Sequence, residues 1–444
     1  MDDYREKSFW LETAGEYTGR PPLEGHQTVD VAVVGGGFTG LSTALHLKER
    51  RPGLRVAVLE AGVVGGGASG RNAGFSMPLF GLSPSVTVLR YGKARLKEAD
   101  QYMVRAVEYT EQLVDRLQID CDYERHGMVT VATQPAHLKR LQEEDEVARQ
   151  AGLHPTEWLD RDQVRQLVDS PTYLGGRYDA WCALLQPAKL ARGMARAAEA
   201  AGAQIYDRTP VTAIYPGGRV RLETPGGSLE AAKVVLATNG YSAGLAPVRS
   251  LQVPIHTYIA LTEPLTPEQV EAIGWHKRVG VEDGRVLIHY YRLTPDNRVL
   301  MGGHDATYHF GNKADIDQNP RIRAQLERTV TETFPALRPV RFTHHWGGPI
   351  SGTLDLVPAI GRRGPNIVYS VGCMGHGVSL SQLNGRTLTD LVLEEQSELT
   401  EAFFVNRRML PVPPEPLRYS VVSSLLGAMR LLDRWENRRR GQGG

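Results

Sequence analysis

Three glycines at a fixed spacing form the first segment whose chemistry can be inferred. Gly35, Gly37 and Gly40 match the pattern G-x-G-x-x-G, and Glu60 follows twenty residues after the third glycine. Such a turn brings backbone N–H groups close to a pyrophosphate, and the later carboxylate can accept hydrogen bonds from an adenosine ribose. The pattern therefore predicts a dinucleotide site. The residues predicted to form it are Gly35, Gly37, Phe38, Thr39, Gly40, Glu60 and Ala61.

The elements around this turn follow the order that such a site requires. Val29 to Val34 is a short β-branched run, typical of a buried parallel strand. A helical pattern begins at Leu41 and stops at Arg51-Pro52-Gly53, and a second strand, Val56 to Leu59, leads to Glu60. The helix N-terminus then faces the phosphate charge. This spacing favours a dinucleotide site over an ordinary βαβ turn, and Glu60 alone does not distinguish FAD from NAD.

A second glycine cluster, Gly65 to Gly74, follows the Glu60 strand directly. It contains Arg71 and Asn72, whose side chains can reach phosphate or ring edges. Glycine permits close approach of backbone to a ligand, and the same composition is also typical of a flexible surface loop. Both interpretations stay open on composition alone.

A third cluster repeats the strand–turn–helix order late in the chain. Ile367 to Val371 predicts a strand, Gly372 to Gly377 a glycine turn, and Val378 onwards a helix. The N-terminus of that helix favours an electron-rich group, and the alternative is a helix start without a ligand. His376 is either a polar neighbour of that group or a capping side chain.

The composition of the whole chain excludes several classes of protein. With 41% hydrophobic and 23% charged residues in 444, disordered and coiled-coil proteins are disfavoured, and a formal net charge of +1 argues against a nucleic-acid binder. Cys121, Cys182 and Cys373 form no CxxC pair, so neither a disulfide framework nor a zinc site is expected. No signal-peptide pattern and no stretch long enough to span a membrane is recognised, so we expect a cytoplasmic location.

Together these segments resemble the D-amino acid oxidase family of FAD-dependent amine and amino acid oxidoreductases. The resemblance rests on Asp30 to Gly62, on Gly67-Ala68-Ser69-Gly70-Arg71-Asn72, and on His345-Trp346-Gly347-Gly348 with Gly375-His376-Gly377. It covers roughly residues 8 to 400 and is most similar in order to the γ-glutamylputrescine oxidoreductase-like branch. It implies an α/β fold, with a Rossmann-type FAD-binding domain and an inserted α+β substrate domain built on an antiparallel sheet.

The implied organisation divides the chain into three parts. A discontinuous FAD-binding domain is expected over residues 1–90, 181–250 and 341–400, and a substrate or cap domain over residues 91–180 and 251–340. Residues 401–444 are expected to form a C-terminal helical extension.

The resemblance also extends the cofactor site beyond the first motif. The further residues that it implies for FAD are Ala68, Ser69, Arg71, Asn72, Val211, Thr238, Asn239, Gly347, Gly375, His376, Gly377 and Val378. Some relatives attach the flavin to a cysteine near the segment that corresponds to Trp346 to Pro349, which holds no cysteine here. We therefore expect noncovalent FAD.

The substrate side is expected on strands with period-two alternation. In relatives such a sheet covers the substrate face of the flavin, and the residues that we place in catalysis are Tyr258, His289, Tyr291, Arg292, Trp346 and His376. His289 and Tyr291 share one face of a regular strand and Arg292 lies on the other, so only one set can line a pocket. The alternative is that these side chains pack the sheet. The adjacent His344 and His345 diverge in a strand, so no metal site is expected.

The function implied by the resemblance is oxidation of a C–N bond. The substrate is expected to be a small amine or amino acid, oxidised to an imine, with electrons passed to O2 to give hydrogen peroxide or to another acceptor. The alternatives are a quinone-linked amine or amino acid dehydrogenase and a non-catalytic flavoprotein assembly factor of the same fold.

The C-terminal extension has its own set of alternatives. Its predicted helix carries an apolar side made of Val421, Val422, Leu425, Leu426, Met429, Leu432 and Trp435, with arginines elsewhere. That side can dock onto the same protein, form a contact in an oligomer, or lie on a membrane surface.

Overall fold

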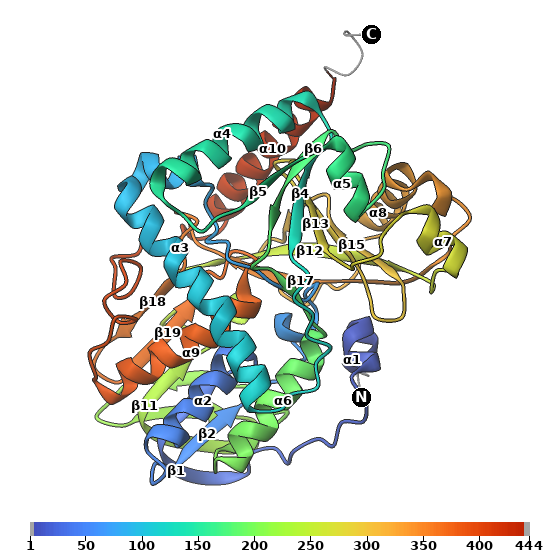
Figure 1. Ribbon diagram of the computed structural model, residues 1–444. Coiled ribbons are helices and arrows are strands. Elements are labelled where there is room, and N and C mark those ends of the chain that lie inside the picture. Colours follow the sequence, from blue (N-terminus) through green and yellow to red (C-terminus); the bar gives the residue numbers. More distant parts are fainter. Residues whose placement is uncertain (1–3, 439–444) are drawn as a thin grey trace.

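The computed structural model describes residues 4–438 and contains two large β-sheets with helices packed against them (Figure 1). Residues 1–3 of the expected FAD-binding domain and residues 439–444 of the expected extension lie outside the described residues. One sheet occupies the lower part of the view in Figure 1 and the other the upper part, with α3 (Pro84–Arg116) running along both.

The first sheet has eight strands and a largely parallel core. The strands β18, β19, β11, β1, β2 and β8 lie side by side in that order, and β10 and then β9 continue from β11 as an antiparallel ribbon. Their bounds are β1 (Gly25–Val34), β2 (Val56–Leu59), β8 (Gln204–Tyr206), β9 (Ala213–Tyr215), β10 (Val220–Thr224), β11 (Gly227–Leu236), β18 (Ala359–Arg363) and β19 (Ile367–Val371).

The predicted strand–helix–strand unit is present in this sheet as β1, α2 (Phe38–Arg50) and β2, and β1 pairs in parallel with both β2 and β11. Val31 and Val33 pack toward the helices, and Ala32 and Val34 pack on the opposite face. Because both faces of β1 are covered, the strand is uniformly apolar there instead of alternating with polar residues.

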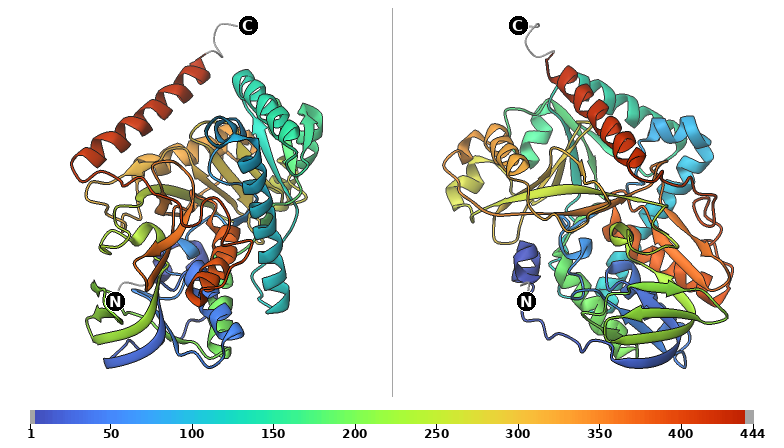
Figure 2. Two further views of the ribbon diagram at one scale, coloured as in Figure 1. Left: turned by 90° about the vertical axis from the view of Figure 1, so that its left-hand side faces the viewer. Right: turned by 180° about the vertical axis from the view of Figure 1, so that it is seen from behind.

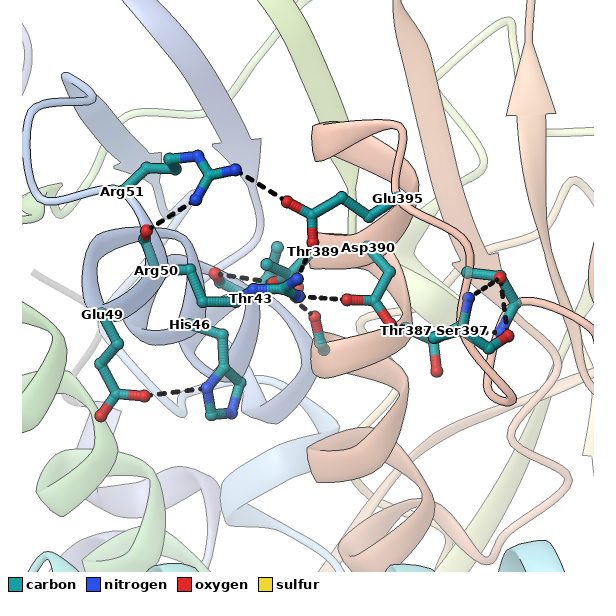
Figure 3. A network of polar contacts seen from close by, with 12 residues as sticks. Thr43, His46, Glu49, Arg50, Arg51, Thr387, Thr389, Asp390, Glu395 and Ser397 are labelled. Atoms are coloured by element: carbon teal, nitrogen blue, oxygen red, sulfur yellow. Dashed lines mark hydrogen bonds and ion pairs between the residues drawn. The ribbon is translucent and has the colours of Figure 1, made fainter.

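Three helices, α2, α6 (Pro187–Ala200) and α9 (Gly377–Leu393), cover one face of the first sheet. Helices α2 and α9 cross closely because Gly385 has no side chain: a Cβ there would lie 2.4 Å from the Cβ of Ser42. Polar contacts tie the ends of the two helices together (Figure 3): Arg50 pairs with Asp390 and Glu395, and Arg51 pairs with Glu395 at 2.9 Å. This packing fixes where the two helix N-termini point.

The second sheet has nine strands, ordered β16, β12, β15, β14, β13, β4, β6 and β5, with β17 on the other edge of β12. All pairs are antiparallel except β13 with β4. The bounds are β4 (Met128–Ala132), β5 (Glu157–Asp160), β6 (Gly175–Asp179), β12 (Val253–Thr262), β13 (Gly280–Asp283), β14 (His289–Leu293), β15 (Val299–Gly303), β16 (Thr307–Tyr308) and β17 (Phe342–Gly352). A hairpin turn joins β14 to β15, and in it Asn297 N–H donates to the Thr294 carbonyl at 2.9 Å.

The two faces of this sheet have different environments. One face packs on α8 (Pro320–Thr333) and buries residues such as Val281, Tyr291 and Met301. The other face carries Ile259 and Leu300 and packs toward the N-terminal segment and the short ribbon of β3 (Phe75–Ser76) and β7 (Ala183–Leu184). The remaining helices are α1 (Phe9–Thr13), α4 (Pro135–Ala151), α5 (Arg161–Leu167), α7 (Pro267–Ala272) and α10 (Leu417–Arg438).

Helix α10 docks onto the same chain, which was one of the three predicted arrangements. Its Val422 and Leu426 are buried against Val253 and Tyr308, and its C-terminal part approaches α4 (Figure 2), where Arg140 pairs with Glu436 at 2.5 Å. The apolar side is wider than this contact, because further apolar residues face outward: Leu417, Val421, Leu425, Leu431, Leu432 and Trp435. Within residues 4–438, no helix is both long and apolar enough to cross a membrane.

The segments expected in each domain contribute to the sheets as follows. Strands of the first sheet come from residues 25–59, 204–236 and 359–371, and strands of the second from residues 128–179 and 253–352. Strand β17 falls inside the segment 341–400, which the sequence assigns to the FAD-binding domain, and it pairs with β12 of the second sheet.

Candidate functional site

A cavity of about 1020 Å³, the larger cavity, opens where the parallel strands β1 and β2 end. The turn after β1 begins at Gly35, whose φ of +108° disfavours any residue with a side chain. Gly35 and Gly37 line the cavity, together with Phe38 and Thr39 at the start of α2. Gly40 does not line it: a Cβ there would lie 2.0 Å from the Gly35 carbonyl oxygen, so Gly40 lets the helix pack on the turn.

Glu60 braces this turn from the end of β2. Its carboxylate accepts the N–H groups of Gly36 at 2.7 Å and Gly62 at 2.8 Å, and burial raises its pKa while those two bonds oppose the rise. The carboxylate and Ala61 both line the larger cavity. A carboxylate oxygen has capacity for further donors, so Glu60 can hold the turn and still accept from a ribose.

The second glycine cluster is an ordered loop that joins the first. Gly65 N–H donates to the Gly36 carbonyl at 3.1 Å, and Ser69 Oγ accepts the N–H of Phe38 at 3.0 Å. Asn72 closes the loop internally, since its Nδ2 donates to the carbonyls of Ala68 and Ser69, both at 3.0 Å. The flexible-loop alternative is therefore disfavoured, and Ala68, Ser69 and Arg71 line the larger cavity.

The far side of the larger cavity carries Val211, Thr238 and Asn239, together with Tyr241. The hydroxyl of Tyr241 is buried and has no hydrogen-bond partner among the described residues. Burial raises its pKa to about 12, so it is a neutral donor near pH 7. A buried hydroxyl without a partner beside a cavity fits a ligand that accepts its hydrogen bond.

A cavity of about 220 Å³, the smaller cavity, adjoins the larger one, and both are lined by Ala68 and Arg71. One side of it is formed by the Gly65–Gly74 loop, by β17 and by the start of α9 with the turn before it: Asn72, Gly347, Gly375, His376 and Val378 line it. The other side is the face of the second sheet that carries Thr257, Ile259, Glu282 and Tyr290. Gly377 begins α9 and lines neither cavity.

His376 stands at the N-cap position of α9 without capping it. Its Nδ1 is buried and has no partner among the described residues, and burial lowers the pKa of the imidazole to about 4. His376 is therefore a neutral polar group at the smaller cavity, and a buried unpaired nitrogen there fits a bound ligand.

Two tyrosines predicted near the substrate lie on the α8 side of the second sheet. Tyr258 and Tyr291 are buried in the core that packs on α8, and neither lines a cavity. The Tyr291 hydroxyl lies 2.9 Å from that of Tyr173, and the Tyr258 hydroxyl lies 3.3 Å from His309 Nε2. Their neighbours Tyr290 and Thr257 face the smaller cavity, as expected from the alternation of a strand.

The other three predicted residues support the site without lining it. Arg292 lies on the same strand face as Tyr290 but deeper, where its Nη1 donates to the carbonyls of Leu185 at 2.8 Å, Ala73 at 3.2 Å and Gly74 at 3.4 Å. Trp346 Nε1 donates to the Arg71 carbonyl at 2.8 Å. His289 pairs with Asp283 at 2.8 Å. None of the three lines either cavity.

Several cavity residues were not singled out from the sequence, among them Tyr241 of the larger cavity and Thr257, Glu282 and Tyr290 of the smaller one. Glu282 and Tyr290 are directly opposed on β13 and β14, and so face the same side. For Tyr290 the available signal was the alternation of side chains along a strand, because Tyr290 and the predicted Arg292 are two residues apart and so share a face. For Glu282 the only signal was an acidic residue inside the short run Gly280 to Asp283.

Comparison with known proteins adds to this geometry. Residues 30–391 match the family model described as FAD dependent oxidoreductase. The chain is 34% identical over 415 residues to a gamma-glutamylputrescine oxidoreductase of Escherichia coli (strain K12), covering 91% of this chain and 95% of that protein. It is 27% identical over 393 residues to the sarcosine oxidase subunit beta of Rhodobacter capsulatus, covering 85% of this chain and 88% of the relative.

The architecture is similar to that of a solved structure, glycine oxidase from Geobacillus kaustophilus. The TM-score is 0.72 at 23% sequence identity, and the match covers 86% of this chain and 100% of that one. At this identity the likeness is one of fold, and it confirms the predicted α/β fold class.

Proposed function

The chain belongs to the FAD-dependent oxidoreductase family, and on that premise we propose that it oxidises the C–N bond of a small amine to an imine, with noncovalent FAD in the larger cavity and substrate in the smaller one. The predicted resemblance to this family and to its γ-glutamylputrescine oxidoreductase-like branch is confirmed. The observation that carries the proposal is the junction at Ala68 and Arg71, where a cofactor in one cavity meets a substrate in the other.

The residues of the larger cavity fit the cofactor. Gly35 and Gly37 let backbone approach a pyrophosphate, Glu60 is placed for a ribose, and Tyr241 offers an unpaired buried hydroxyl. FAD would supply the two-electron acceptor for the reaction. The N-terminus of α9, at Gly377, adds positive potential at the smaller cavity, where negative charge would be stabilised.

The chain's own contribution is binding and orientation. The smaller cavity is lined mostly by apolar atoms, and such surroundings strengthen each polar contact made there. His376, neutral near pH 7, offers one buried nitrogen for a hydrogen bond and carries no charge that would oppose an ammonium. In the overall change the amine loses two electrons and two protons, and water hydrolyses the imine to a carbonyl compound and ammonia.

Anaerobic mixing with a panel of amines tests the proposal. An amine substrate bleaches the oxidised flavin absorption, whereas a flavoprotein that is only an assembly factor keeps it with every amine. Acid precipitation tests the attachment, because noncovalent FAD appears in the supernatant and covalent flavin stays with the pellet.

A second candidate differs in its electron acceptor, which would be a membrane quinone in place of O2. The observation that favours it is the outward apolar side of α10, where Leu425 and Trp435 are 55% and 54% exposed. Stoichiometric hydrogen peroxide from amine and O2 supports the oxidase. Turnover with a quinone analogue without peroxide, and binding to liposomes that truncation at Pro411 abolishes, supports the dehydrogenase.

We further propose that the second sheet, including β17, forms the substrate domain, and that the enzyme acts in the cytoplasm. The extent of the substrate domain is inferred from the pairing of β17 with β12. The cytoplasmic location is inferred from the three cysteines, which are all free thiols in this structure.

A further inference from the structure

Three charged residues line the smaller cavity: Arg71, Asp305 and Glu282. Arg71 pairs with Asp317 at 2.5 Å, and Asp305 accepts from Arg430 at 2.8 Å. Within residues 4–438, Glu282 alone among the three has no hydrogen-bond or ion-pair partner. The cavity therefore presents one carboxylate that is free to bind.

The position of Glu282 is set by the sheet. It lies on β13 opposite Tyr290, and both face the cavity, while Val281 and Tyr291 face the core on the other side. The side chain is buried, with 8% of the residue exposed. Burial and the neighbouring Asp283 raise its pKa to about 7, against a lowering by Arg177.

A buried carboxylate without a partner is costly to the folded protein. Removing an unpaired ionised group from water is unfavourable, and such groups concentrate at functional sites. A hydrophobic residue at position 282 would continue the apolar wall formed by Ile259 and Leu287. The carboxylate is better explained by a cation that enters the cavity and pairs with it.

Among the residues that the structure describes, the lining of the same cavity has no unpaired cationic side chain for an anion. Arg292, the guanidinium on the same strand face, donates to the carbonyls of Ala73 and Gly74 in the Gly65–Gly74 loop and to that of Leu185, and it does not line the cavity. Arg71 is already paired with Asp317. Recognition of a carboxylate by protein side chains normally relies on such a guanidinium with free N–H groups.

We propose that Glu282 binds an ammonium group of the substrate, and that it makes the cavity select amines without a carboxylate on the reacting carbon over α-amino acids. This inference rests on the proposed function. Glu282 is thus a specificity-determining residue, because its charge attracts the cation and repels an α-carboxylate, for which the described lining of the cavity offers no unpaired cationic side chain.

The test uses the FAD-loaded full chain in anaerobic stopped-flow reduction. The substrates are straight-chain monoamines and diamines of two to six carbons, each paired with its analogue that carries a carboxylate on the carbon next to nitrogen, such as butylamine and 2-aminopentanoate. Glu282→Gln is compared with Glu157→Gln, a control on β5 of the same sheet whose side chain is exposed. Flavin content and unfolding temperature are measured for both variants.

The native enzyme is expected to be reduced at least about tenfold more efficiently by the amines than by their carboxylated analogues. Glu282→Gln should lower the efficiency of flavin reduction by amines about a hundredfold, which lies within the range for removal of one partner of a buried charge pair. It should also reduce the preference for amines over their carboxylated analogues. Its flavin content should stay unchanged, and Glu157→Gln should match the native enzyme.

The outcomes separate the inference from the proposed function. Efficient reduction by amines in both the native enzyme and Glu282→Gln, or a native preference for the carboxylated analogues, overturns the inference and leaves the proposed function standing. Absence of reduction of the native flavin by every amine overturns both.

Discussion

The larger and the smaller cavity meet at Ala68 and Arg71, but different kinds of structure form their walls. The larger one is shaped by backbone turns, in which Gly35 has a φ of +108° and Gly65 a φ of +72°. The smaller one is shaped on its sheet side by side chains that alternate along strands, such as Thr257, Glu282 and Tyr290. The first kind of wall can serve a cofactor common to many enzymes, and the second can change with the substrate.

This difference has a physical consequence for substitutions. A side chain added to a glycine turn collides with backbone, which cannot move aside without refolding the loop. A side chain exchanged on a strand face changes what the cavity binds and leaves the ladder of backbone hydrogen bonds in place. Changes in the larger cavity should therefore act on cofactor content, and changes in the smaller cavity on substrate affinity.

The largest effect is expected for Gly40→Ala. The new Cβ would lie 2.0 Å from the Gly35 carbonyl oxygen, so α2 must shift away from the turn. Overpacking of this kind costs about 1–3 kcal/mol or more, and because the clash is with backbone we expect the purified variant to retain almost no bound flavin. Absorbance of the purified protein at the flavin band and thermal unfolding measure the change. Gly53→Ala is the control, since nothing lies within 4 Å of a Cβ there; normal flavin content in Gly40→Ala would contradict a backbone-built cavity.

The next effect is expected for Glu60→Ala. The substitution removes the acceptor of the Gly36 and Gly62 N–H groups and the carboxylate placed for a ribose. Loss of charged hydrogen bonds of about 1.5–3 kcal/mol corresponds to roughly 10–100-fold weaker FAD binding. Titration of FAD into flavin-free protein measures the dissociation constant. Glu24→Ala, at an exposed residue just before β1, should bind FAD as the native chain does; equal affinity in Glu60→Ala would remove Glu60 from the site.

The larger cavity was open to prediction because its geometry is local. A motif of strand, glycine turn, helix and second strand is specified by about thirty consecutive residues. Gly35, Phe38 and Glu60 of this motif all line the larger cavity. Position 40 shows the limit of such a pattern: Gly40 belongs to the motif but contributes close packing instead of cavity surface.

The smaller cavity depends on contacts between distant segments. Alternation places Tyr258 and Thr257 on opposite faces, but which face meets α8 and which meets the cavity is decided by packing of β12 against residues far along the chain. Glu282 lies on a four-residue strand, β13, that pairs with β4 in parallel. No pattern within the run Gly280 to Asp283 specifies that pairing.

A third prediction concerns the pH dependence of ligand affinity, which should be seen for amine binding in the smaller cavity and not for FAD binding in the larger one. Glu282 has a pKa of about 7, so amine affinity should rise about tenfold per pH unit below 7 and level off above it, as the carboxylate ionises while the amine stays protonated. Two other groups that face the smaller cavity titrate outside this range, because burial lowers the pKa of His376 to about 4 and raises the pKa of Tyr290 to about 12.

Anaerobic stopped-flow reduction at a series of amine concentrations, from pH 6 to pH 8, gives the dissociation constant of the amine and so measures this dependence. Glu282→Gln should show a flat profile, and the affinity for FAD should not follow the same curve in either protein. An identical inflection near pH 7 in Glu282→Gln would assign the titration to another group and contradict the charge of the smaller cavity.

The smallest effect is expected from α10, which braces the smaller cavity from outside. The Asp433 carboxylate accepts the N–H groups of Val286 at 2.8 Å and Leu287 at 2.9 Å, and both residues line that cavity. Asp433→Ala leaves two N–H groups without their acceptor and loosens the loop between β13 and β14. We expect about threefold weaker amine binding with unchanged flavin content, measured by anaerobic titration, because about 0.7 kcal/mol corresponds to that factor. Leu432→Ala, whose side chain is 51% exposed on the outer side of the helix, is the control. Loss of flavin in Asp433→Ala would mean that α10 supports the larger cavity too, and that the two cavities are less separable than their construction indicates.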